Sequence, residues 1–149
     1  MIRTLTALFV VALSAACASP ADPTFSSSPA TREAGLPFSE AVQVGPLLFV
    51  SGQIGAAPGG TSVVPGGIGP ETRQVMENIR AILRRNGSSL DRVVKCTVFL
   101  ADVSEWAAFN AVYVTFFEAD ALPARSALGA NGLAAGARVE VECIAAANE

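Results

Sequence analysis

The sequence predicts an α+β fold in which one sheet carries two helices, both packed on the same face. The predicted order is strand–strand–helix–strand–helix–strand–strand. Three patterns support it: a hairpin turn near residue 45, a helical stripe after residue 70, and alternating apolar side chains between residues 94 and 100. Strand-type and helix-type periods in one chain are typical of a layered domain with a single core.

The first predicted elements are a hairpin and a helix, separated by a long loop. Two apolar runs in EAVQVGPLLFVSGQIG flank Gly45 and Pro46, which mark a turn between two strands. Residues 55–69 are rich in glycine and proline, which predicts a loop. The helix that follows begins near Pro70 and presents one apolar stripe, formed by Val75, Ile79, Ile82 and Leu83.

The middle of the chain predicts a strand and a second helix. In DRVVKCTVFLADV the residues expected to share one face are Val94, Cys96, Val98 and Leu100. Aromatic residues then recur at helical spacing, at Trp106, Phe109, Tyr113, Phe116 and Phe117. We expect this aromatic stripe to pack in the core.

Two strands after Pro123, ARSALGA and RVEVECIAA, complete the predicted sheet. In the last strand Glu140 and Glu142 fall on the face opposite to Val141. Because two helices cover only one face of a sheet, the other face needs a cover. Further copies of the same chain are the simplest cover.

Composition excludes several classes of function. The chain has 149 residues, of which 51% are hydrophobic and 15% are charged, as is typical of one globular domain. It contains no histidine, and its three cysteines form no C-x-x-C pair, so we expect no metal site. A net charge of −3 without a basic stripe argues against nucleic acid as a partner.

The first residues are typical of an export signal. MIRTLTALFVVALSAACAS has one arginine, an apolar run that is short for a membrane span, and then small residues. We therefore expect residues 1–17 to be a signal peptide and the mature protein to be periplasmic. Two alternatives stay open: SAAC resembles a lipobox, which would anchor a lipidated Cys17 in the membrane, whereas Ala16-x-Ala18 predicts plain cleavage after Ala18.

Residues 18–34 are rich in Pro, Ser and Ala and show no period. This composition predicts a flexible linker, which would suit a tether to a membrane anchor. The folded domain is expected to span residues 35–149.

Several segments of this domain together resemble the RidA family, also called the YjgF or reactive intermediate deaminase family. They are VSGQIG, VVKCTVFLADVSEWAAFN, LPARSAL and VEVECIA, and the resemblance runs from about Gly35 to Ala146. It implies a chorismate-mutase-like fold and a homotrimer with active sites in clefts between subunits. It also implies hydrolysis of reactive 2-enamino and 2-imino acids to 2-keto acids and ammonia, with no cofactor.

The resemblance assigns roles to two charged residues. Arg125 matches the arginine that binds the substrate carboxylate, and a planar guanidinium can make two parallel hydrogen bonds to such a group. The competing interpretation is a structural salt bridge from Arg125 to a glutamate of the neighbouring strand. Glu140 matches the acid that activates the attacking water, with Glu142 as the less favoured candidate.

Four further residues match the substrate pocket of the family. Asn110 and Ser51 are expected to be polar pocket residues, and backbone groups near Ala127 to hold the substrate. Phe38 stands where active members often carry a tyrosine, so the aromatic wall is kept and the hydroxyl is lost. Ala127 stands where some members have a cysteine.

Two functions stay open at this point. The first is an exported deaminase of small imino acids, which Arg125 and Glu140 favour. The second is a non-catalytic trimer of the same fold that binds a carboxylate metabolite or acts as a holdase, which Phe38 and the export signal favour. A ribonuclease activity finds no support in the charge. Cys96 and Cys143 are expected to be separate buried thiols.

Overall fold

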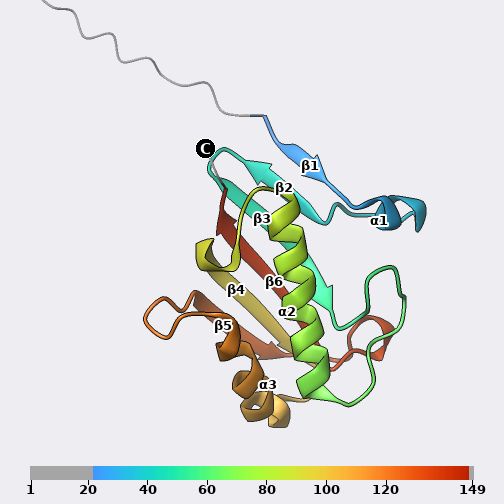
Figure 1. The fold of residues 1–149 in the computed structure, drawn as a ribbon. Helices are drawn as coiled ribbons and strands as arrows, with labels where there is room; N and C mark the ends of the chain where they lie inside the picture. Colours follow the sequence, from blue (N-terminus) through green and yellow to red (C-terminus); the bar gives the residue numbers. More distant parts are fainter. Residues whose placement is uncertain (1–21, 148–149) are drawn as a thin grey trace, which may run out of the picture.

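The computed structural model describes residues 22–147, which form one sheet with helices against it (Figure 1). The strands are β1 (Thr24–Ser26), β2 (Ala41–Val44), β3 (Leu47–Ile54), β4 (Val93–Leu100), β5 (Ala124–Gly129) and β6 (Val139–Ala146). The helices are α1 (Pro29–Glu33), α2 (Ile68–Arg85) and α3 (Trp106–Tyr113). The signal peptide predicted over residues 1–17, with Cys17, lies outside the described residues.

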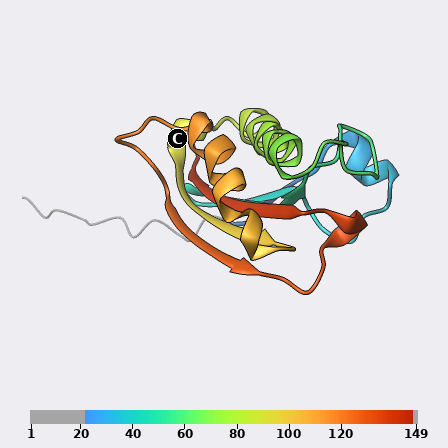
Figure 2. The same ribbon diagram turned by 90° about the horizontal axis from the view of Figure 1, so that it is seen from below.

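The strands follow the order β1-β2-β3-β6-β4-β5. All neighbours are antiparallel except β4 and β5, which are parallel and are connected through α3. Figure 2 shows α2 and α3 on the same face of the sheet. The predicted α+β order and the one-sided helix cover are therefore confirmed, and β1 and α1 are added before the first predicted hairpin.

A flexible linker is predicted for residues 18–34, but its described part, residues 22–34, contains β1 and α1, while residues 18–21 lie outside the described residues. β1 pairs with β2, and Phe25 lies opposite Val42. Glu40 fixes the following helix, because its carboxylate accepts hydrogen bonds from the Ser28 backbone N–H at 2.7 Å and from the Thr31 hydroxyl at 2.6 Å. These contacts explain why a Pro- and Ser-rich stretch is ordered here.

The core lies between the sheet and its two main helices. The predicted stripe of α2 is buried, and Phe109 of α3 packs with it against Val98 and Val141 of the sheet. Each such side chain contributes roughly 1.5–3 kcal/mol through burial. One predicted core position is wrong: an irregularity in the pairing of β4 between Val93 and Lys95 buries Val93 and leaves Val94 exposed.

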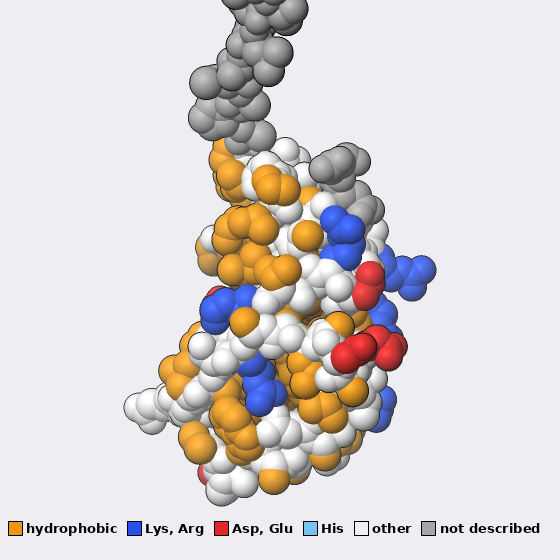
Figure 3. All heavy atoms as spheres, turned by 90° about the vertical axis from the view of Figure 1, so that its left-hand side faces the viewer, with side chains coloured by type: hydrophobic (Ala, Val, Ile, Leu, Met, Phe, Trp, Pro, Cys, Tyr) orange, Lys and Arg blue, Asp and Glu red, His pale blue; other side chains and the backbone are white. Residues whose placement is uncertain are grey.

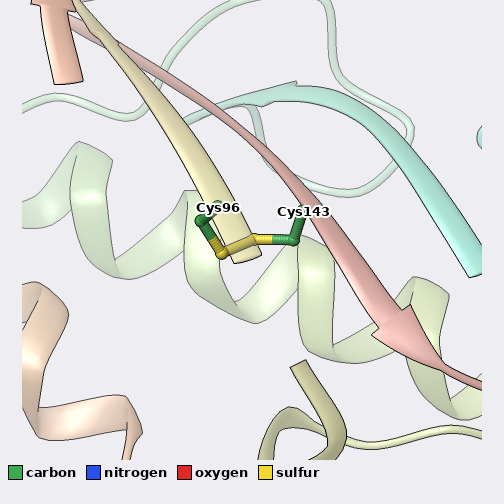
Figure 4. Close-up of a disulfide and its surroundings, with 2 residues drawn as sticks. All are labelled: Cys96 and Cys143. Carbon is green, nitrogen blue, oxygen red and sulfur yellow. A yellow bond between two sulfur atoms is a disulfide. The ribbon is translucent and has the colours of Figure 1, made fainter. Parts of the chain in front are cut away.

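Cys96 and Cys143 form a disulfide, so the prediction of separate thiols is wrong (Figure 4). The two residues are direct partners on β4 and β6, with their Cα atoms 4.1 Å apart. They are 47 residues apart in the sequence, and only the insertion of β6 between β3 and β4 makes them neighbours. The local strand pattern of each cysteine carries no information about that pairing.

No helix within residues 22–147 covers the other face of the sheet, which we call the open face. Direct cross-strand partners form an apolar row on it, made of Phe25, Val42, Phe49 and Ile144. Phe25 is 70% exposed and Phe49 is 41% exposed. Figure 3 shows hydrophobic side chains exposed over much of one side of the molecule, with basic side chains between them. Exposed apolar area of this kind is typical of an interface.

The described residues contain no helix that is both long and apolar enough to cross a bilayer.

Candidate active site

Arg125 lies on the helix-covered face of the edge strand β5. Its partner in the parallel register is Cys96, whose side chain is buried on that face. The Arg125 Nη1 donates a hydrogen bond to Asn110 Oδ1 at 2.7 Å. Asn110 follows the buried Phe109 in α3, so the packing of this helix sets the position of the acceptor.

Three aromatic rings of α3 surround the Arg125 guanidinium. Its central carbon lies 4.9 Å from the ring centre of Tyr113, 5.2 Å from that of Trp106 and 5.8 Å from that of Phe109. A cation near a ring face is attracted by the ring quadrupole. The aromatic stripe therefore packs in the core, as predicted, and also contacts the predicted substrate-binding arginine. That second role depends on where β5 lies, which the spacing of the aromatics does not reveal.

Tyr113 contacts Arg125 as a neutral ring. Burial raises the pKa of Tyr113 to about 12, and the nearby positive charge of Arg125 only partly offsets the effect. The hydroxyl is buried and has no hydrogen-bond partner within the described residues. The attraction between the two side chains is thus of the cation–π type.

The structure does not support a structural salt bridge for Arg125. None of the ion pairs formed among residues 22–147 includes it. Asn110 occupies one of the several N–H groups of the guanidinium, which leaves others free for a ligand. Ala127, two residues further along β5, points to the same face and is half-buried.

Glu140 lies on the open face, against β3. Its cross-strand partners are Phe99 on β4 and Ile54 on β3, and its side chain lies over Gly52. The residue before Gly52 is Ser51, whose hydroxyl donates a hydrogen bond to the Ser39 carbonyl oxygen at 2.7 Å. Phe38 precedes Ser39 and is 48% exposed, so the ring is available at the surface.

The predicted site residues thus form two groups. We call Asn110, Arg125 and Ala127 the arginine half-site, and Phe38, Ser51 and Glu140 the glutamate half-site. Arg125 pairs with Cys96, and Glu140 pairs with Phe99 three residues further along β4, so the two side chains leave opposite faces of the sheet. A small ligand cannot contact both in one chain, because the sheet lies between them.

Glu142 shares the open face with Glu140. It lines a hollow of about 290 Å³ whose other lining residues include Lys95, Thr97 and Ser51 of the glutamate half-site. This hollow contains neither Arg125 nor Glu140. Within residues 22–147, no group of three or more acidic or cysteine side chains could hold a metal ion.

Comparison with known proteins identifies the family. Residues 28–147 match the family model described as Endoribonuclease L-PSP, which represents the RidA (YjgF) family. The chain belongs to the RidA family. The match covers both half-sites and includes β2 to β6.

Relatives within the RidA family cover most of this chain. A mouse protein named 2-iminobutanoate/2-iminopropanoate deaminase is 42% identical over 109 residues, which are 73% of this chain and 80% of the relative. The crystal structure of RidA from the Antarctic bacterium Psychrobacter has a TM-score of 0.70 at 38% identity and covers 74% of this chain and 89% of its own. The crystal structure of the yeast protein YEO7 has a TM-score of 0.75 at 36% identity, covering 85% and 100%.

Proposed function

We propose that this chain hydrolyses 2-imino and 2-enamino acids to 2-keto acids and ammonia, in a site built by two subunits. The observation that carries the proposal is the Arg125 guanidinium, which is fixed by Asn110 and three rings but forms no ion pair within residues 22–147. Such a group is suited to bind a carboxylate through two parallel hydrogen bonds. The names of the deaminase relatives support the reaction.

The reaction needs a base that activates water and a group that binds the substrate carboxylate. With the substrate carboxylate on Arg125, Glu140 accepts a proton from a water molecule as the water oxygen attacks the carbon of the protonated imine. The resulting tetrahedral adduct carries a hydroxyl and an amine on that carbon. Glu140 returns the proton to the nitrogen and the carbon–nitrogen bond breaks. As ammonia leaves, the hydroxyl gives its proton to Glu140, which leaves the 2-keto acid, and Glu140 then releases this proton to solvent. An enamine first takes a proton on carbon to become the protonated imine.

Two subunits are needed because the half-sites lie on opposite faces of the sheet. In the proposed homotrimer, the glutamate half-site of one subunit faces the arginine half-site of the next. The uncovered apolar row on the open face and the family membership support such an assembly. Phe38 then forms an aromatic wall without a hydroxyl.

A coupled assay that generates 2-iminopropanoate in place tests the proposal. The purified protein should accelerate the release of ammonia, and Glu140→Gln should stop turnover while still binding a 2-keto acid product. If the folded wild-type protein leaves the release of ammonia at its uncatalysed rate, the proposed deaminase activity is contradicted.

Phe38 favours a second candidate, a trimer that binds carboxylate metabolites without converting them. The missing hydroxyl at this position is the observation behind it. Calorimetry and the coupled assay together separate the two functions. The binding protein would bind a 2-keto acid through Arg125 and show no turnover, whereas the deaminase would bind the 2-keto acid and also hydrolyse 2-iminopropanoate.

We also propose that the protein is exported to the periplasm. The disulfide between Cys96 and Cys143 supports this, because disulfides persist mainly in oxidising compartments. The apolar run after Arg3 supports it as well. Fractionation should find the cleaved protein outside the cytoplasm, and an uncleaved cytosolic chain would contradict export.

If Cys17 is lipidated, Cys17→Ser should release the protein from membranes. A wild-type protein that is already free of membranes would exclude lipidation.

A further inference from the structure

We propose that Gly52 is a positioning residue for catalysis, because the absence of a side chain there determines where the Glu140 carboxylate lies. The inference rests on the proposed function, in which Glu140 activates the attacking water. It adds a residue on β3 that acts through Glu140.

The contact between the two residues leaves no room for a methyl group. A Cβ atom added to Gly52 would lie 2.0 Å from Glu140 Oε1, 2.9 Å from its Cδ and 3.1 Å from its Cγ. The first distance is far below the carbon–oxygen contact distance of roughly 3.3 Å. Any larger residue at position 52 must therefore displace the Glu140 side chain or the strand beneath it.

The backbone does not itself require glycine at this position. Gly52 is absent from the described glycines with positive φ, so another residue could adopt its conformation. The local irregularity is a bulge: Val50 pairs with Cys143 and Gln53 with Val141, so one extra residue of β3 fits between these pairs. Bulges re-aim strands beside active sites, and strand glycines often mark a close approach. The close approach of Glu140 is the reason that the structure offers for glycine here.

The position of Glu140 matters because its carboxylate has no ionic partner. None of the ion pairs among the described residues includes it, so packing against Gly52 is a main constraint on the side chain. A misplacement of about 1 Å at a reacting group can cost on the order of a hundredfold in rate. Gly52→Ala should therefore lower kcat far more than it changes KM.

A stability cycle tests the contact without any activity measurement. Gly52→Ala should lower the melting temperature of the wild type only slightly, because the atoms that a Cβ would meet belong to the flexible Glu140 side chain, which can move aside, and this small loss should vanish in a Glu140→Ala background. An equal loss in both backgrounds would overturn the inference, since glycine would then be needed for the backbone alone.

An activity cycle tests the positioning role. Gly52→Ala should reduce kcat by about tenfold or more, and adding Glu140→Asp should partly restore it, although Glu140→Asp alone lowers activity. Gly69→Ala is the matched control, because a Cβ there would meet only Val112 Cγ2, at 4.0 Å. No gain on adding Glu140→Asp would overturn the positioning role. Wild-type turnover by Glu140→Gln would instead overturn the proposed role of Glu140, and an absence of turnover by the wild type would overturn the proposed function, while the stability cycle still decides the contact.

Discussion

Arg125 is fixed by neutral groups, and this determines how its substitutions should behave. Its guanidinium contacts three rings and one amide oxygen, none of which carries a charge. A guanidinium in such surroundings keeps hydrogen-bond donors for a ligand. These contacts position Arg125 to bind a ligand and do not make it part of a structural ion pair.

Arg125→Lys keeps the positive charge but loses the planar pair of donors. Losing one charge-assisted hydrogen bond costs about 1.5–3 kcal/mol, so kcat/KM for 2-iminopropanoate should fall by about ten- to a hundredfold. The melting temperature should stay close to that of the wild type, because no ion pair of Arg125 within the described residues is lost. Normal kcat/KM with a lowered melting temperature would indicate a structural role.

At the scale of elements, local patterns predict strands and helices well but not their neighbours. The stripe of α2 and the alternation of β4 are local, and both elements form. The insertion of β6 between β3 and β4 depends on long-range pairing, and both the disulfide and the separation of Arg125 from Glu140 follow from it. Likewise, α1 is ordered by hydrogen bonds to the Glu40 carboxylate. The Pro- and Ser-rich composition around α1 does not predict these hydrogen bonds.

The disulfide should stabilise the pairing of β4 with β6. Closing a loop of this length removes entropy from the unfolded chain, and native disulfides of this kind contribute about 2–4 kcal/mol. Cys96→Ala combined with Cys143→Ala should therefore lower the free energy of unfolding, measured in denaturant, by this amount. Mass spectrometry of the purified wild type should show a gain of two hydrogens on reduction; an unchanged mass would contradict the disulfide.

Glu40 should make the docking of α1 depend on pH. Burial raises the pKa of this carboxyl, but the hydrogen bonds from Thr31 and Ser28 and the charge of Arg85 together lower it below its usual value. A pKa that is lower in the folded state stabilises the fold above the unfolded-state pKa, and this stabilisation is lost as pH falls through the folded-state pKa.

Glu40→Gln should therefore lower the melting temperature at neutral pH, and its difference from the wild type should shrink in acid. Glu77→Gln is the control, because Glu77 pairs only with Arg80 on an exposed helix surface among the described residues. A Glu40→Gln difference that does not change with pH would contradict the assigned network.

On the scale of the whole molecule, the open face should be the assembly surface. Phe49 lies near the middle of the apolar row and is 41% exposed, so Phe49→Glu would place a charge in the proposed interface. Light scattering on the chain from residue 22 onward should give three times the chain mass for the wild type and a lower mass for Phe49→Glu. Activity should fall together with assembly. A fully active monomer would contradict a shared site.

Subunit mixing tests the shared active site most directly. Arg125→Ala and Glu140→Gln each remove one half-site, so each variant alone should be inactive towards 2-iminopropanoate. When the two variants are co-expressed in equal amounts, about a quarter of the sites should combine an intact Arg125 from one subunit with an intact Glu140 from another. Mixed oligomers should therefore recover a corresponding part of wild-type activity. Mixed oligomers that form but stay inactive, or wild-type activity in Arg125→Ala alone, would contradict the account.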